Sequence, residues 1–159
     1  MGLPVYVEIE TAEGKKIAGE CTEAEHKDWI FGFGFSSGVS IPTDPNSGKV
    51  TGSRVHMPFE FAKPVDKSSP ILFQAMCKGG LLKKVVVDLM QKDQSGNEVN
   101  FYRYTFSEAQ IVAMTAESPD IRDVGQQFVA CHEKVRIRYR KVQVEHRLAN
   151  TMAVDEFMT

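Results

Sequence analysis

The feature that most constrains the fold of this chain is a strict alternation of apolar and cationic side chains near its C-terminal end. Residues 135, 137 and 139 are Val, Ile and Tyr, and they alternate with Lys134, Arg136, Arg138 and Arg140. A period of two places these sets on opposite faces of a β-strand, so one face packs into a core. The phase slips at residue 141, and we expect a β-bulge near Arg140 to cause that slip.

Similar alternation elsewhere predicts a mainly β chain. We expect half-buried strands at residues 5–9, 55–61, 82–91, 99–106 and 110–115. The fourth of these would pair with the third across a turn at residues 93–96, where a glycine allows a positive φ. In the segment 29–36, four aromatic residues would form a core face. The opposite face would be nearly bare, with Ile30, Gly32, Gly34 and Ser36.

One short helix and two long polar segments interrupt the strand patterns. The helix is expected at about residues 69–78, with Ser69 as its N-cap, a proline at its first position and a glycine at its end. Residues 42–53 and 116–127 are typical of extended surface loops. We therefore expect one mainly β domain over residues 1–159, either a two-sheet sandwich or a closed barrel.

Composition and charge exclude several classes of protein. The chain has 159 residues, 42% of them hydrophobic and 25% charged, which is ordinary for a single globular domain. No apolar run approaches the roughly 18 residues of a membrane span, and we expect no secretory signal, because the first ten residues lack a basic start followed by an apolar stretch. The net charge of −2 argues against a nucleic-acid partner. Three widely spaced cysteines are expected to be reduced thiols.

Each candidate motif for catalysis, a metal or a cofactor lacks a residue or a spacing that its chemistry requires. The glycines from residue 32 to 38 have the spacing GxGxxxG inside a strand pattern, which does not fit a phosphate-binding loop. Residues 44–55 lack the closing glutamate of a calcium-binding EF-hand. Only Cys131 and His132 are adjacent candidate zinc ligands, and neighbouring strand residues point to opposite faces. We expect no enzyme, no metal and no cofactor.

The four cations of residues 134–140 are the strongest polar signal in the chain. They fit a solvated strand face equally well as a surface that pairs with carboxylates of another strand or another subunit. In the second case Glu8 and Glu10 of the first strand pattern are the candidate partners. The sequence leaves both readings open.

The segment from residue 41 to 76 resembles the Hcp family, the hemolysin-coregulated tube proteins of bacterial type VI secretion. The residues that carry the resemblance are Ile41, Pro42, Thr43, Asp44, Gly48, Lys49, Thr51, Gly52, Arg54, His56, Pro58, Phe59, Phe61, Lys63, Asp66, Ser68, Ser69, Pro70 and Leu72. The rest of the chain agrees more loosely. Two departures are the phenylalanines of residues 31–35, where many relatives have Trp, and residues 149–159, which match nothing in the family pattern.

This resemblance implies a two-sheet β-barrel with one helix that assembles into homohexameric rings with an open centre. The rings would stack into the inner tube of a contractile machine, together with spike, sheath and baseplate proteins, and could carry effector proteins in the lumen. The chain would be cytoplasmic until assembly and would then be secreted without a signal peptide. It implies neither catalysis nor membrane insertion. The alternative function is a monomeric secreted binding module or effector chaperone without a tube role.

Site residues follow from combining the resemblance with the strand patterns. The loop at residues 42–53 corresponds to the family loop that reaches the neighbouring ring, so we assign to ring stacking Thr43, Asp44, Lys49 and Arg54. Small side chains leave room for cargo, so the expected lumen residues are Gly32, Gly34 and Ser36. The expected subunit-interface charges are Lys134, Arg136, Arg138, Arg140, Glu8 and Glu10.

Overall fold

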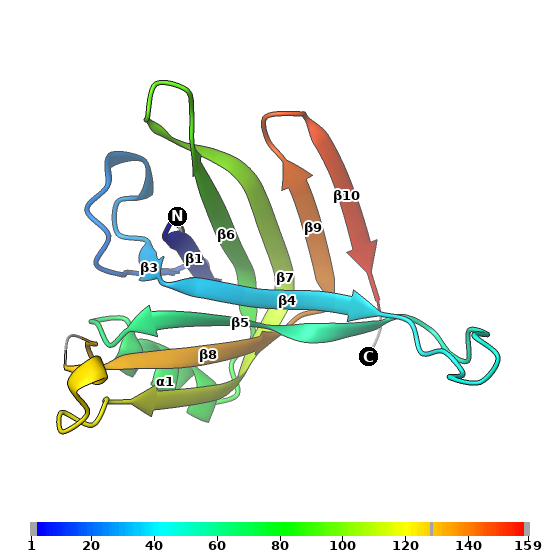
Figure 1. The fold of residues 1–159 in the computed structure, drawn as a ribbon, viewed down its shortest axis with the longest axis horizontal. Helices are drawn as coiled ribbons and strands as arrows, with labels where there is room; N and C mark the ends of the chain where they lie inside the picture. The colour runs from blue at the N-terminus through cyan, green and yellow to red at the C-terminus, as the bar shows by residue number, and fades with distance from the viewer. Residues whose placement is uncertain (1–2, 128, 158–159) are drawn as a thin grey trace.

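The computed structural model describes residues 3–127 and 129–157, and it is built of antiparallel strands with one α-helix (Figure 1). The strands are β1 (Val5–Thr11), β2 (Lys16–Ile17), β3 (Ile30–Gly32), β4 (Gly34–Ser40), β5 (Val55–Pro64), β6 (Leu82–Lys92), β7 (Glu98–Glu117), β8 (His132–Arg138), β9 (Lys141–His146) and β10 (Thr151–Glu156). The helices are α1 (Ser69–Cys77) and the short 3₁₀ helices η1 (Ala24–His26) and η2 (Val124–Gln126). The prediction of a mainly β chain with one short α-helix is confirmed.

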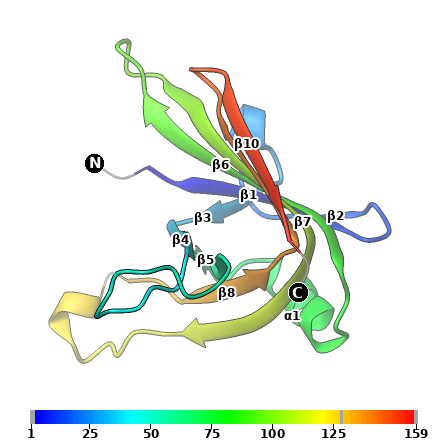
Figure 2. The same ribbon diagram turned by 90° about the vertical axis from the view of Figure 1, so that its right-hand side faces the viewer.

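The strands form two layers that share β7. The order is β2-β1-β6-β7-β8-β5-β4, with β3 on β1, β9 on β7 and β10 on β9. The first part of β7 pairs with β6 and β9, and residues 110–117 pair with β8. We call the layer around β6 the β6 sheet, and β4, β5, β8 and the end of β7 the β8 sheet (Figure 2). Over the described residues the sheet does not close on itself, so the closed barrel is wrong and the two-sheet alternative describes the fold.

A bend in β7 explains why its sequence looks like two strands. The strand has 20 residues, and Glu108 near its middle has a φ of 50°. A positive φ at a non-glycine residue marks a sharp local change of direction. The register with β8 also shifts between Ile111 and Ala113. The two predicted strands, 99–106 and 110–115, are therefore one strand that passes from the β6 sheet to the β8 sheet.

The β8–β9 segment changes sheets at the point where its sequence pattern slips. β8 pairs with β5 and β7 in the β8 sheet, whereas β9 pairs with β7 and β10 in the β6 sheet. Tyr139 and Arg140 lie between the two strands. The predicted bulge is therefore wrong, because the strand ends at Arg138 and a new one begins at Lys141.

The core lies between the two sheets. Phe59 and Phe61 of β5 and Phe106 of β7 are fully buried, and the rings of Phe59 and Phe106 lie 4.9 Å apart. Full burial of one such side chain contributes about 1.5–3 kcal/mol. Val135 and Ile137 of β8 are also fully buried, while the cations between them are exposed. The alternation of residues 134–140 is thus confirmed.

The aromatic face predicted for residues 29–36 is only partly correct. Ile30 is fully buried although it was assigned to the bare face, and Phe33 is 54% exposed although it was assigned to the core. The reason is a bend at Phe33, where the chain stops pairing with β1 and starts pairing with β5. The bend reverses the phase, and Phe35 then packs against Phe59.

The N-cap of helix α1 lies one residue earlier than expected. Its N-cap is Ser68, which makes no side-chain capping bond, and Ser69 is the first helical residue. The hydroxyl of Ser69 bonds instead to Glu133 and accepts from Lys63. Leu72 is fully buried and anchors the helix. Within the described residues, no helix has the length and apolar character needed to cross a bilayer.

Candidate functional site

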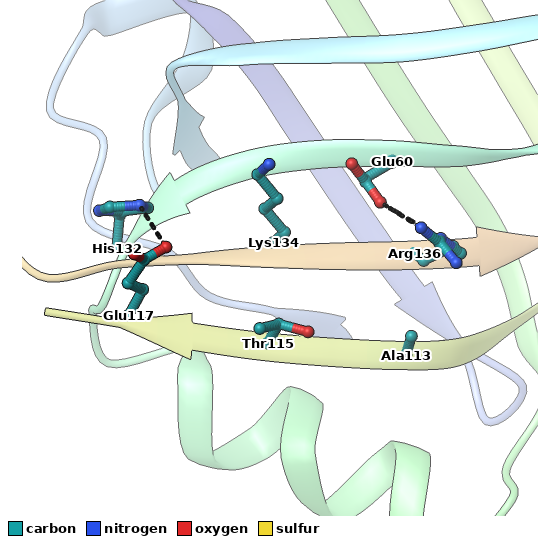
Figure 3. A pocket seen from close by; sticks show the side chains of 7 residues that line it. All are labelled: Glu60, Ala113, Thr115, Glu117, His132, Lys134 and Arg136. Atoms are coloured by element: carbon teal, nitrogen blue, oxygen red, sulfur yellow. Dashed lines mark hydrogen bonds and ion pairs between the residues drawn. The ribbon is translucent and has the colours of Figure 1, made fainter.

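The outer face of the β8 sheet combines small and charged residues in two rows across four strands. In antiparallel pairs, directly opposed residues project from the same face. The first row is Gly34, Ala62, Lys134 and Thr115, and the second is Ser36, Glu60, Arg136 and Ala113. Much of this face forms a shallow hollow of about 270 Å³ (Figure 3). We call it the β8 face.

Lys134 lies between two ion pairs on the β8 face. Arg136 donates to Glu60 at 2.9 Å, and His132 lies 3.8 Å from Glu117 (Figure 3). Among the described residues, no carboxylate oxygen lies within 4.0 Å of the Lys134 ammonium group. Lys134 is exposed and its neighbours in the first row are small, so the hollow stays open to solvent.

Two of the three predicted lumen residues lie on the β8 face. Gly34 and Ser36 are there, and a Cβ added to Gly34 would meet no atom within 4 Å. Gly32 is buried instead, and a Cβ there would lie 3.3 Å from the carbonyl oxygens of Ala62 and Val5. The prediction that Gly32 shares an exposed face with Gly34 and Ser36 is therefore wrong. The sequence pattern could not show this, because the bend at Phe33 reverses the phase.

The predicted interface charges divide between two sheets. The four cations of residues 134–140 are exposed along the β8 side of the molecule, and Arg140 lies 3.5 Å from Glu108. Glu8 and Glu10 lie on β1 in the β6 sheet. Each already has a partner in its own subunit, since Glu8 lies 3.3 Å from Lys16 and Glu10 lies 3.7 Å from Lys83. The structure therefore does not bring these acids to the cations within one subunit.

The predicted stacking residues lie on a loop that extends away from the sheets at the ends of β4 and β5 (Figure 1). We call residues 41–54 the arm. Asp44 accepts from the backbone N–H of Asn46 at 2.9 Å and from the Ser47 hydroxyl at 3.0 Å, and these bonds lower the pKa of Asp44. Gly48 has a φ of 71°, which closes the turn. The arm is thus an ordered turn, and its exposed tip carries Lys49.

The C-terminal strand holds the base of the arm. Arg54 donates to both carboxylate oxygens of Asp155, at 2.6 and 2.8 Å, and His56 Nε2 lies 2.6 Å from the same group. Bonds from Arg54 and His56 lower the pKa of Asp155, and the bond to Asp155 raises the pKa of Arg54. Phe157 stacks on His56 with ring centres 4.1 Å apart. We call Arg54, His56, Asp155 and Phe157 the arm clamp.

The C-terminal tail forms a strand that the sequence patterns did not predict. Residues 149–159 had no assignment, and their last two residues lie outside the described part of the chain. β10 pairs with β9 over six residues. The alternating Met152 and Val154 that follow the turn after β9 could have indicated this hairpin.

A second charged group is buried beneath helix α1. Lys63 of β5 is fully buried, and its ammonium group donates to Glu133 at 2.5 Å and to Ser69 at 2.9 Å, and it lies 3.0 Å from Asp66. One ammonium group thus faces two carboxylates. We call Lys63, Asp66, Ser69 and Glu133 the lysine cluster.

A third group surrounds a buried histidine. His26 Nε2 lies 2.8 Å from Asp88, and Nδ1 lies 2.6 Å from Glu23. Arg103 donates to both oxygens of Asp88, at 2.5 and 2.8 Å. Burial alone would lower the pKa of His26, but its bonds to the two carboxylates raise it. Burial likewise opposes ionisation of Asp88, yet His26 and Arg103 lower its pKa to about 2.

The nearest approach to a metal site in the described residues involves the same histidine. Ligand atoms of Glu23, Glu25 and His26 lie within 4.8 Å of one another. Both ring nitrogens of His26 are already bonded to carboxylates. A metal ion would have to displace one of these bonds, so the geometry fits a structural hydrogen-bond network better than a metal centre.

Comparisons with known proteins give one consistent result. The family described as type VI secretion system effector, Hcp, matches residues 6–146. The "Major exported protein" of Pseudomonas aeruginosa is 32% identical in an alignment of 166 positions that covers 99% of this chain and 96% of that protein. A crystal structure of an Hcp protein has a TM-score of 0.90 at 28% identity and covers 98% of each chain. A mutant of Hcp1 from E. coli EAEC 042 has a TM-score of 0.88 at 27% identity, covering 99% of this chain and 100% of that chain.

These similarities cover nearly the whole chain and agree with the resemblance of residues 41–76. They bear out the expectation that the chain is not an enzyme, because the family consists of secreted structural proteins. They also indicate secretion, and they imply partners within the type VI secretion system. The chain belongs to the Hcp family of type VI secretion proteins.

Proposed function

We propose that this chain is the repeating subunit of a type VI inner tube, forming hexameric rings that stack and are expelled with the machine. The observation that carries the proposal is that two different exposed apolar surfaces lie at opposite ends of the β8 sheet. The arm end exposes Ile41 and Val50, and the other end has a hollow of about 440 Å³ lined by Phe33 and Val129. A head-to-tail assembly needs such unlike surfaces on one subunit.

The arm supports the stacking role. It extends beyond both sheets, its turn is held by Asp44, and its base is fixed by the arm clamp. An ordered protrusion loses less conformational entropy on docking than a flexible one. We therefore assign contact with the adjacent ring to Thr43, Asp44, Lys49 and Arg54.

The β8 face is the proposed channel wall. Gly34 and Ser36 leave it open, and they share it with Lys134 and Arg136. Effector proteins carried in the lumen would contact these residues. Arg138 and Arg140, farther along the same side, remain predicted subunit-interface charges, as do Glu8 and Glu10 on β1.

The first test is the solution mass of the purified protein, measured by light scattering after size exclusion at low and high salt. We expect a mass near six subunits, and dissociation at high salt would implicate exposed charges in the ring contact. A monomer under both conditions would favour the secreted binding module. Electron microscopy of a variant lacking residues 44–51 tests the arm, and unchanged tubes in that variant would rule out its role in stacking.

Cargo contact has a separate test. Gly34→Trp and Ser36→Trp should reduce retention of an effector in purified rings while the ring mass stays the same. The matched control is Val39→Trp, at an exposed position near the arm end of β4, and it should not affect retention. Equal retention in all three variants would exclude the β8 face as the cargo wall.

A further inference from the structure

The end of the molecule opposite the arm has a pocket with unneutralised negative charge. Its volume is about 340 Å³, and its walls are Tyr6, Glu20, Cys21, Thr22, Glu23, Phe31, Pro64 and Asp66. Three of these residues carry carboxylates, and no cation is among the residues that line it. We call this the acidic pocket.

One carboxylate oxygen of the pocket is buried without a partner. The side chain of Asp66 is only 2% exposed, and its Oδ1 accepts from the backbone and hydroxyl of Ser68. Its Oδ2 has no hydrogen-bond partner in the described part of the chain. A buried oxygen of a charged group without a partner costs free energy, so a cation held in the pocket beside Asp66 would stabilise this carboxylate.

The surrounding charges do not balance the pocket. Asp66 and Glu133 share the single ammonium group of Lys63. Glu23 has His26 as its only cationic neighbour within 4.0 Å, and Glu20 accepts only from the backbone N–H of Lys67 among the described residues. Four carboxylates thus face one lysine and one histidine, which leaves a net charge of −2 or −3, depending on whether His26 is protonated. A further cation would stabilise this arrangement.

The walls also suit a cation that carries an aliphatic stem. Tyr6 and Phe31 are edge-to-face neighbours with ring centres 6.3 Å apart. Tyr6 is only 4% exposed and its ring stacks on His26, so the half-buried ring of Phe31 is the aromatic surface that the pocket offers. An ammonium group near that ring gains cation–π attraction, and a lysine stem packs against apolar surface while its head reaches polar groups. The pocket therefore fits a lysine side chain better than a bare metal ion.

The arm of a second copy supplies such a side chain. Lys49 is exposed at the arm tip, and no carboxylate lies within 4.0 Å of its ammonium group among the described residues. The arm leaves one end of β5, whereas Pro64 and Asp66 lie at and just beyond the other end. Ten strand residues at about 3.3 Å each separate them, so Lys49 cannot reach the pocket of its own subunit.

We propose that Lys49 of one subunit inserts into the acidic pocket of a subunit in the adjacent ring and pairs there with Glu20, beside the buried carboxylate of Asp66. This contact rests on the proposed stacking function and names its acceptor. The contact also gives both the negative pocket and the unpaired lysine a partner of opposite charge, which each gains only when rings stack head to tail.

Zero-length carbodiimide crosslinking of the wild-type protein at high concentration tests the contact. Mass spectrometry should find an amide between Lys49 and an acid of the pocket, with Glu20 as the accessible partner. Lys49→Arg should still stack but lose the crosslink, because a guanidinium does not form the amide. Crosslinks between subunits that never join Lys49 to the pocket would overturn the proposal.

Charge exchange gives an independent test. Lys49→Glu and Glu20→Lys should each reduce tube formation at least tenfold, and the double variant should recover it. Lys92→Glu, on an exposed site of the hairpin between β6 and β7, is the matched control and should stack as the wild type does. Hexamers by light scattering that stack equally in all variants would refute the contact alone. A wild-type monomer would refute the proposed function.

If the wild-type protein is a monomer, the preference of the acidic pocket for lysine can still be tested. A cyclic peptide copying residues 41–54 should bind the monomer more tightly, by fluorescence anisotropy, than the same peptide with Glu at position 49. Equal affinity for the two peptides would overturn the pocket's preference for lysine.

Discussion

At the arm end of the molecule, Arg54 and His56 share the carboxylate of Asp155, whereas at the pocket end the single ammonium group of Lys63 faces both Asp66 and Glu133. Arg54 and Asp155 of the first group are partly exposed, with exposed side-chain fractions of 44% and 36%, while the second group is buried and has anions in excess. Exposed charges exchange partners with water at little cost, but buried ones depend on each other. The two ends should therefore respond very differently to the loss of one charge.

The largest effect is expected at the lysine cluster. Lys63→Met leaves Glu133 and Asp66 buried without their cation, so the free energy of unfolding should fall by about 3–5 kcal/mol. Urea denaturation followed by circular dichroism measures the change. The matched exposed variant, Lys49→Met, should stay within about 0.5 kcal/mol of the wild type.

A second variant distinguishes the loss of the buried cation from a loss of packing as the cause of the lower stability. Adding Glu133→Leu to Lys63→Met removes one of the two uncompensated carboxylates, and part of the lost stability should return. If the double variant is less stable than Lys63→Met alone, the excess negative charge is not what destabilises the single variant. The contrast between the two ends would then need another cause.

An intermediate effect is expected from the histidine network, which borders the acidic pocket through Glu23. The pKa of Asp88 is lowered to about 2, so its contribution is present above its unfolded pKa near 4 and is lost as the pH falls towards 2. The pKa of His26 is raised, so its contribution is present below about 6.5 and is lost as the pH rises through its folded pKa. Stability should therefore be greatest between about pH 4 and 6.5.

Asp88→Asn is the variant that checks this pH dependence. It should lower the free energy of unfolding at pH 5.5 by about 1–2 kcal/mol, because it weakens the bonds to both His26 and Arg103. Urea unfolding at pH 3, 5.5 and 8.5 should also show a flatter profile than the wild type. An unchanged profile in the variant would assign the pH dependence to other groups.

Sequence patterns predicted the parts of this structure that depend on local periodicity. The alternation of residues 134–140 gave the faces of β8, and the Pro and Gly signals gave α1 and the arm. What they could not give were the places where the chain changes partner strands. The bends at Phe33 and Glu108 reverse or redirect a pattern, and only the paired strands determine where that happens.

The candidate sites show the same division. Gly34 is partly exposed and Ser36 is exposed on the β8 face, but Gly32 is buried, because it lies before the change from β1 to β5. The lysine cluster and the arm clamp join residues 70 and about 100 positions apart. No short motif marks such pairs in one sequence, since their chemistry arises only when the strands are side by side.

The smallest effect on the free energy of unfolding is expected at the arm clamp. There, a variant should change the order of the arm more than the stability of the fold. Asp155→Asn should lower the free energy of unfolding far less than Lys63→Met does, because Arg54 and Asp155 are exposed. Hydrogen exchange at residues 42–53 should nevertheless become faster, since the base of the arm loses the bonds from Arg54 and His56. Phe157→Ala, which removes the stacking on His56 and keeps the ion pair, should accelerate exchange less. If neither variant changes exchange in the arm, its order comes from its own turn at Asp44 and not from the clamp at its base.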